Sequence, residues 1–184
     1  MTGVQTCALP IFDVFKDSAA KERLTDPIET ARVGYGVIVR AGAAKPDLST
    51  PDAFKKTLLA ASSVASVPAS AAGAYVTKVY ERLGIADEMK AKTKVEALPT
   101  AIAPSVARGE AELGVFLTNV FNAPGIELAG AFPADLQQEL LFAAAIARYA
   151  KATIAAKALL DFLKTPPAVA AIKAAGMTPA PHTD

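Results

Sequence analysis

A run of small residues offers the clearest place for chemistry in this sequence. Ala71, Ala72 and Gly73 lie between a predicted strand over residues 64–67 and a helix whose 3.6-residue period is plain from Ala74 onward. The start of a helix carries unpaired N–H groups and the positive end of the helix dipole, and small side chains let a ligand approach both closely. The run therefore predicts an anion-binding position, although a tightly packed connection between strand and helix would look the same.

A second run has the same character. Pro104 is predicted to open a short helix with Ser105 and Val106 in its first turn. Residues 112–117 read as a strand, and Thr118 follows at its carboxyl end, which is where open α/β sheets bind their ligands. Two such helix starts can hold a dianion without a cationic side chain, because main-chain N–H groups and dipoles offset its charge.

Side chains for catalysis or metal binding are scarce. The only histidine is His182 and the only cysteine is Cys7, so no Ser-His-Asp or Cys-His system and no His/Cys metal site is predicted. Glu110 and Glu112 flank a turn, and we interpret them as part of a solvated surface. The sequence therefore favours a binding protein over an enzyme, and it predicts no cofactor.

The composition indicates a globular chain without nucleic-acid or membrane contacts of its own. Apolar residues make up 52% and charged residues 20% of the 184 residues, and the formal net charge is +1 with no basic run. The uncharged residues 57–77 are interrupted by Pro68, Gly73 and several serines, so they predict no membrane span.

Strand and helix signals alternate along the chain. Alternating hydrophobicity predicts a strand over residues 33–39. A short apolar run favours another strand over residues 140–147, although a helix would show the same pattern. Thr50, Pro51 and Asp52 give a hydroxyl N-cap, a proline at the first helical position and an acid in the first turn, so a helix begins there.

A helix with one apolar face is predicted over residues 152–164. Its inward-facing side chains would be those of Ala155, Leu159, Phe162 and Leu163. Pro166 and Pro167 end it and begin a second helix, which Gly176 stops.

Several motifs resemble the periplasmic molybdate-binding proteins of ABC importers. In that family a strand leads through a proline and a small turn into Ala-Gly-x-Tyr and a helix ending in Leu-Gly, as residues 72–75 and 83–84 do here. The similarity runs from residue 12 to residue 179, and it is closest to the broader molybdate-protein-like group. It implies an α/β, type II periplasmic-binding-protein fold, with two lobes joined by hinge strands.

The resemblance also implies a set of ligand contacts. The expected contacts are Ala71, Ala72, Gly73, Ser105, Val106, Leu117 and Thr118. Ala72 and Val106 match the family's two main-chain donors. The family's tyrosine hydroxyl corresponds to Phe116 or Leu117, neither of which has a hydroxyl, and Thr118 offers a substitute.

The same resemblance divides the chain into lobes. Residues 33–147 would be the second lobe with hinge strands at its ends, and residues 12–32 and 148–184 the remnant of an incomplete first lobe. Residues 1–11 resemble a translated sequencing adapter left on a metagenomic read. We therefore expect the signal peptide and the ligand hydroxyls of the first lobe to be missing, and this truncated chain alone to bind no oxyanion tightly.

The expected function follows from these points. The full-length protein would capture a small oxyanion, molybdate or tungstate, in an inter-lobe cleft in the periplasm. It would deliver the ligand to the permease of an ABC importer, which is its only link to a membrane. Two alternatives stay open: the same fold binding another small organic anion, and the effector-sensing domain of a transcription regulator.

Overall fold

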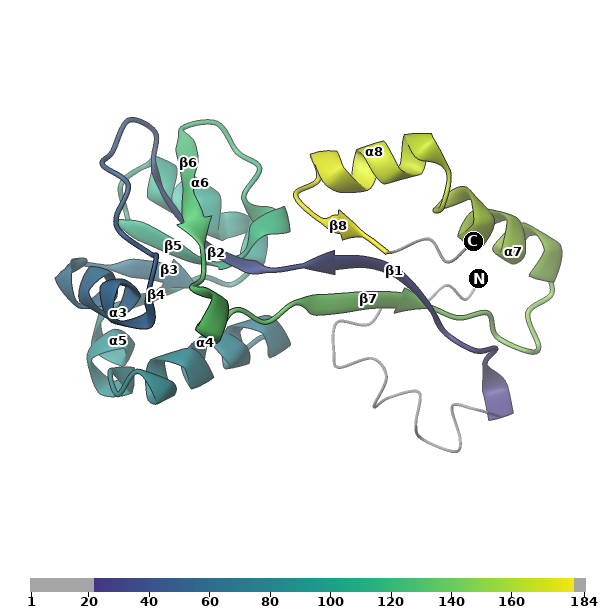
Figure 1. Ribbon diagram of the computed structural model, residues 1–184, viewed down its shortest axis with the longest axis horizontal. Helices are drawn as coiled ribbons and strands as arrows, with labels where there is room; N and C mark the ends of the chain where they lie inside the picture. The colour runs from purple at the N-terminus through teal and green to yellow at the C-terminus, as the bar shows by residue number, and fades with distance from the viewer. Residues whose placement is uncertain (1–21, 181–184) are drawn as a thin grey trace. The chain divides into compact units, whose positions relative to one another are not determined.

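The computed structural model describes residues 22–180, which form two compact units (Figure 1). The second unit is the continuous segment Gly34–Glu139, and the first unit contains the described residues before and after it. The predicted tail of residues 1–11 lies outside the described residues. The chain passes between the units at two places, after Val33 and after Glu139, where the predicted strands over residues 33–39 and 140–147 begin.

The first unit is built on a small antiparallel sheet. Its central strand β1 (Ile28–Val33) pairs with β7 (Leu140–Ala144) on one side and with β8 (Thr178–Pro179) on the other. Two helices, α7 (Thr153–Phe162) and α8 (Pro166–Ala174), connect β7 to β8. Gly176 has a φ of +73° just after α8, which confirms its predicted role in stopping that helix.

The prediction for the inward face of α7 is wrong. Leu160 is the buried residue of this helix, whereas Leu159 is 43% exposed and Phe162 is 53% exposed. Ala155 is exposed as well, and Leu163, just after the helix, is half-buried. An amphipathic pattern identifies the apolar side of a helix, but it does not identify what packs against that side.

The second unit contains a five-stranded sheet in the order β4-β3-β5-β2-β6. Its strands are β2 (Tyr35–Arg40), β3 (Val64–Ser66), β4 (Thr93–Val95), β5 (Leu113–Leu117) and β6 (Ile126–Ala131). Strand β3 is parallel to both β4 and β5, and β2 is antiparallel to both β5 and β6. The strands predicted over residues 64–67 and 112–117 are confirmed as β3 and β5.

Short helices connect these strands. They are α3 (Pro51–Ala60), α4 (Ala71–Arg82), α5 (Ala86–Lys92), α6 (Ile102–Ala107) and the 3-10 turns η1 (Pro99–Ala101), η2 (Thr118–Val120) and η3 (Ala134–Leu136). The predicted start of α3 is confirmed, because the Thr50 hydroxyl accepts a hydrogen bond of 3.1 Å from the amide of Ala53. None of the helices in the described residues is long and apolar enough to cross a membrane.

The helices cover both faces of this sheet. On one face, Phe54 of α3 packs against Phe132 with ring centroids 4.8 Å apart, and Tyr75 of α4 packs against Tyr35 of β2. On the other face, a Cβ at Gly114 would meet the side chains of Ile38 and Ile102, so α6 lies close to the sheet there. Phe54, Ile38 and Ile102 are all fully buried, and they belong to the core of this unit.

Candidate functional site

The connections of the second unit create a switch in strand order. From β3 the chain runs through α4 and α5 to β4 on one side, and it then returns through α6 to β5 on the other side of β3. The connections therefore leave the sheet in opposite directions at the carboxyl ends of β3 and β5. Open α/β sheets bind ligands at such a switch point, so this edge of the sheet is the candidate site.

Helix α4 begins at this edge. It starts at Ala71, three residues before the predicted start, because Ser70 is the N-cap. The Ser70 hydroxyl accepts a hydrogen bond of 3.0 Å from the amide of Gly73, and the amide of Ala74 is bonded to the Ser70 carbonyl. The amides of Ala71 and Ala72 have no hydrogen-bond partner in the described part of the chain. Two donors at the positive end of a twelve-residue helix are thus available to an anion.

Gly73 brings this helix start close to the preceding loop. A Cβ at this position would lie 1.8 Å from the carbonyl oxygen of Val67 and 2.8 Å from the Cα of Pro68. Since both are main-chain atoms, only glycine fits where α4 approaches the end of β3. The small residues of the predicted run therefore serve close packing, and they also leave the two free amides without bulky neighbours from the run itself.

The second predicted helix start is wrong in position. Helix α6 begins at Ile102 after a 3-10 turn from Pro99, so Pro104 lies inside its first turn and does not open it. Ser105 and Val106 are its fourth and fifth residues, where amides already belong to the helical ladder. Both residues are fully buried. Their assignment as ligand contacts stays a prediction that depends on the resemblance alone.

Leu117 and Thr118 lie at the carboxyl end of β5, as expected. Leu117 pairs with Tyr35 of the neighbouring strand. The amide of Thr118 donates to the carbonyl of Gly34 at 3.0 Å, and its hydroxyl donates to the same oxygen at 3.3 Å. The Thr118 side chain therefore takes part in holding β5 to the start of β2, and its role as a substitute hydroxyl for a ligand stays a prediction.

Tyr35 is a residue of this edge that the sequence patterns did not single out. It is 2% exposed, and its ring lies 4.9 Å from that of Tyr75 and 5.5 Å from that of Phe132 between centroids. Burial, with a smaller contribution from Tyr75, raises the pKa of Tyr35 to about 12. A phenol is neutral near pH 7 even at its ordinary pKa, and this shift widens the margin, so Tyr35 can donate a hydrogen bond without repelling an anion.

The neighbours of Tyr35 are fixed by hydrogen bonds. The Gln137 side chain accepts from the Tyr35 amide at 2.8 Å and donates to the Tyr35 carbonyl at 2.9 Å. The Tyr75 hydroxyl donates to the carbonyl of Leu136 at 2.9 Å, so Tyr75 serves packing and anchors α4 to η3. The alternation of residues 33–39 could have identified Tyr35 as the inward residue at the start of a strand, but not its partners.

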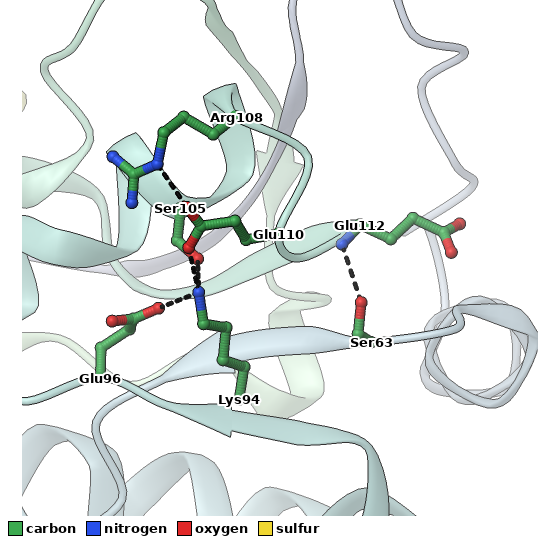
Figure 2. Close-up of polar contacts among 7 residues, drawn as sticks. All are labelled: Ser63, Lys94, Glu96, Ser105, Arg108, Glu110 and Glu112. Atoms are coloured by element: carbon green, nitrogen blue, oxygen red, sulfur yellow. Dashed lines mark hydrogen bonds and ion pairs between the residues drawn. The ribbon is translucent and has the colours of Figure 1, made fainter.

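A second polar cluster lies beside α6 (Figure 2). Lys94 and Arg108 both contact the Glu110 carboxylate, and the Lys94 ammonium also lies 2.9 Å from the Ser105 hydroxyl and 3.3 Å from a carboxylate oxygen of Glu96. Hydrogen bonds from Arg108 and then Lys94 lower the pKa of Glu110 to about 2. Two cations face two carboxylates, so this cluster offers no excess positive charge to an anion.

Glu112 is similarly engaged at the surface. Its carboxylate accepts hydrogen bonds from the amide and the hydroxyl of Ser62, at 2.8 and 2.7 Å, and these bonds lower its pKa. Its amide is bonded to the Ser63 hydroxyl at 3.2 Å (Figure 2). Glu110 and Glu112 are therefore surface residues, as interpreted from the sequence, but each is tied to specific partners.

Other candidate sites in the described residues offer less. No group of three or more His, Cys, Asp or Glu residues that could hold a metal ion occurs in residues 22–180. A hollow of about 550 Å³ is lined by the loop after β2, the end of α3 and the start of β5. Since β5 starts there, this hollow lies at the opposite edge of the sheet from the start of α4.

Comparison with known proteins places the chain in a family. A family model described as bacterial extracellular solute-binding protein matches residues 13–178. Aconitate isomerase from Pseudomonas sp is 38% identical over 146 residues, which are 78% of this chain and 55% of that protein. The chain thus spans about half the length of this curated relative.

Solved structures agree on the fold. The substrate-binding domain of a molybdenum ABC transporter protein from Clostridium difficile has a TM-score of 0.76 at 16% identity, covering 97% of this chain and 77% of that chain. The periplasmic molybdate-binding protein of Azotobacter vinelandii has a TM-score of 0.67 at 22% identity, covering 97% and 78%. These similarities confirm the predicted α/β fold of periplasmic binding proteins. The chain belongs to the family of bacterial extracellular solute-binding proteins.

Proposed function

We propose that this protein binds a small anion at the carboxyl edge of the second unit's sheet, as the solute-binding component of an ABC importer. The observation that carries the proposal is the pair of amides, Ala71 and Ala72, at the start of α4, which have no hydrogen-bond partner within residues 22–180. They lie at the switch point of the sheet, and the helix dipole adds to their positive potential. The periplasm is the proposed compartment, and the importer's permease is the proposed partner.

A tetraoxyanion such as molybdate or tungstate is the first ligand candidate. It offers four acceptor oxygens to main-chain donors and needs no cationic side chain when the site excludes water. The names of the two structural relatives, which refer to molybdenum and molybdate, support this choice. Leu117 weakens it, because the resemblance to the molybdate-binding proteins places a tyrosine hydroxyl at residue 116 or 117.

An organic polycarboxylate is the second candidate. It is favoured by the 38% identical relative, which is named for its action on aconitate. A carboxylate presents two acceptor oxygens to the α4 amides, and its carbon skeleton would suit apolar neighbours such as Leu117. We infer binding and not catalysis for this chain, because the matching family model describes solute-binding proteins. Ser105 lies 2.9 Å from the Lys94 ammonium, but the serine is fully buried and the lysine is held by Glu96 and Glu110.

Isothermal titration of the full chain distinguishes these candidates. The probes are molybdate, tungstate, sulfate and the two isomers of aconitate, each added to the same preparation at constant ionic strength. The proposal requires saturable binding of at least one of them, at the weak affinity expected of this chain, and the order of affinities identifies the ligand class. Absence of saturable binding for all of them would overturn the proposal, and interconversion of aconitate isomers, followed by NMR, would overturn the non-catalytic assignment.

A further inference from the structure

Tyr35 presents a hydroxyl that the described part of the fold does not use. Only 2% of the residue is exposed, and its main-chain groups are bonded to Gln137 and Phe132. Within the described part of the chain, its hydroxyl makes no hydrogen bond. A hydroxyl that the described residues leave unbonded, at the tip of a ring that is otherwise covered, is available to a ligand.

The strand register places Tyr35 at the candidate site. Tyr35 pairs directly with Leu117, the last residue of β5, and opposed residues of an antiparallel pair project from the same face of the sheet. Tyr35 therefore lies at the carboxyl end of β5, next to the position where the sequence lacks a hydroxyl.

The aromatic contact connects Tyr35 to the start of α4. Its ring lies 4.9 Å from the ring of Tyr75, which follows Ala71 by one helical turn. Side chains of an α-helix lean toward its N-terminus, so the Tyr75 side chain leans toward the turn that contains Ala71 and Ala72. The Tyr35 ring is thus connected through Tyr75 to the first turns of α4, where the two amides lie.

We propose that Tyr35 is a specificity-determining residue of the anion site, with its hydroxyl donating a hydrogen bond to an oxygen of the anion held by the Ala71 and Ala72 amides. This inference rests on the proposed function. The inference explains why the Tyr35 hydroxyl is unused by the described residues. Tyr35 supplies, from β2, the hydrogen-bond donor that the end of β5 lacks. The raised pKa keeps the phenol protonated through the physiological pH range, so it acts only as a neutral donor.

The test compares Tyr35→Phe with Tyr80→Phe. Tyr80 is a matched control because its hydroxyl likewise makes no hydrogen bond to the described residues, but it is fully buried and lies nine residues beyond Ala71 along α4. Both variants lose one unbonded oxygen, so both are expected to fold, which circular dichroism melting checks. The ligand is whichever of molybdate, tungstate, sulfate and aconitate binds the parent chain most tightly.

Loss of a hydrogen bond to a charged ligand should weaken binding by about 10- to 100-fold in Tyr35→Phe. Tyr80→Phe should bind like the parent chain. An anion should also perturb the tyrosine ultraviolet absorption of the parent chain and of Tyr80→Phe, because the phenol becomes a hydrogen-bond donor on binding, whereas Tyr35→Phe should lack this difference spectrum.

The outcomes separate the two proposals. If the parent chain binds none of the anions, the proposed function and this inference are both overturned. If the parent chain binds an anion but Tyr35→Phe binds it equally well, only the role of Tyr35 is overturned. Saturable binding to the parent chain with no change in tyrosine absorption overturns that role as well, and this measurement does not depend on the folding of any variant.

Discussion

Gly73→Ala is the most informative substitution in this protein, because two effects on stability have opposite signs. Alanine forms helix better than glycine by about 1 kcal/mol, so helix propensity alone would make the variant more stable. The added Cβ, however, would lie 1.8 Å from the carbonyl oxygen of Val67. Helix α4 and the Val67–Pro68 main chain would have to separate by about 1.2 Å to reach even 3.0 Å, a distance below which real Cβ contacts essentially never occur.

The size of the destabilisation by Gly73→Ala follows from the kind of atoms that the added Cβ would meet. Overpacking typically costs about 1–3 kcal/mol, and a clash with main-chain atoms belongs at the upper end because no side-chain rotation relieves it. After the gain in helix propensity, we expect Gly73→Ala to lower the free energy of unfolding by about 2 kcal/mol. The same displacement would move the Ala71 and Ala72 amides, so anion binding should weaken in parallel.

Urea unfolding followed by tyrosine fluorescence measures this loss of stability in the second unit of the structure, where the substitution lies. The chain has no tryptophan and four tyrosines, and Tyr35, Tyr75 and Tyr80 all lie in the second unit. For an m-value of about 2 kcal/mol/M, the urea midpoint should fall by about 1 M. Ala74→Gly, at an exposed position in the same turn, is the control and should cost about 1 kcal/mol through helix propensity alone. A Gly73→Ala variant as stable as the parent chain would refute the close seating of α4.

Substitutions at three further positions test other parts of the second unit. Ser70→Ala removes the N-cap of α4 and should cost about 1 kcal/mol in urea unfolding, whereas Ser70→Gly should cost only a few tenths; equal losses would contradict the capping role. Arg108 and Lys94 lower the pKa of Glu110 from 4.5 to about 2, so this carboxylate adds stability above pH 4.5 that is lost as the pH falls toward 2. Glu110→Gln should therefore make the loss of stability on acidification less steep. If the melting temperature of the variant falls with pH as steeply as that of the parent chain, the result argues against this ion cluster. Phe54→Ala should cost about 3–5 kcal/mol, because the side chain is fully buried, and a loss below 1 kcal/mol would place it outside the core.

The elements predicted correctly were those with local causes. Thr50, Pro51 and Asp52 fix the start of α3 through one hydroxyl and one ring, and the residues that do this are adjacent in the sequence. Gly84 ends α4 with a φ of +67°, as the C-cap rule predicts. Prolines gave a less certain signal. Pro104 is tolerated anywhere in the first helical turn, so the rule that places it at the helix start put α6 two residues too late.

The candidate site could be predicted only in part. The free amides of Ala71 and Ala72 follow from a helix start, which is a local property, although Ser70 and not the helix period sets its first residue. Tyr35 could not be identified in this way, because its importance comes from pairing with Leu117, 82 positions along the chain. Strand register between distant segments depends on the whole sheet, and no short sequence pattern encodes it.

The order of strands in the first unit has a consequence for biosynthesis. Strand β1 precedes the entire second unit in the chain, whereas both of its sheet neighbours, β7 and β8, come after it. A ribosome therefore releases β1 long before its neighbours exist, and the nascent strand has two open edges during that interval. The second unit is one continuous segment of the chain, so it can complete its sheet before β7 and β8 of the first unit have been synthesised.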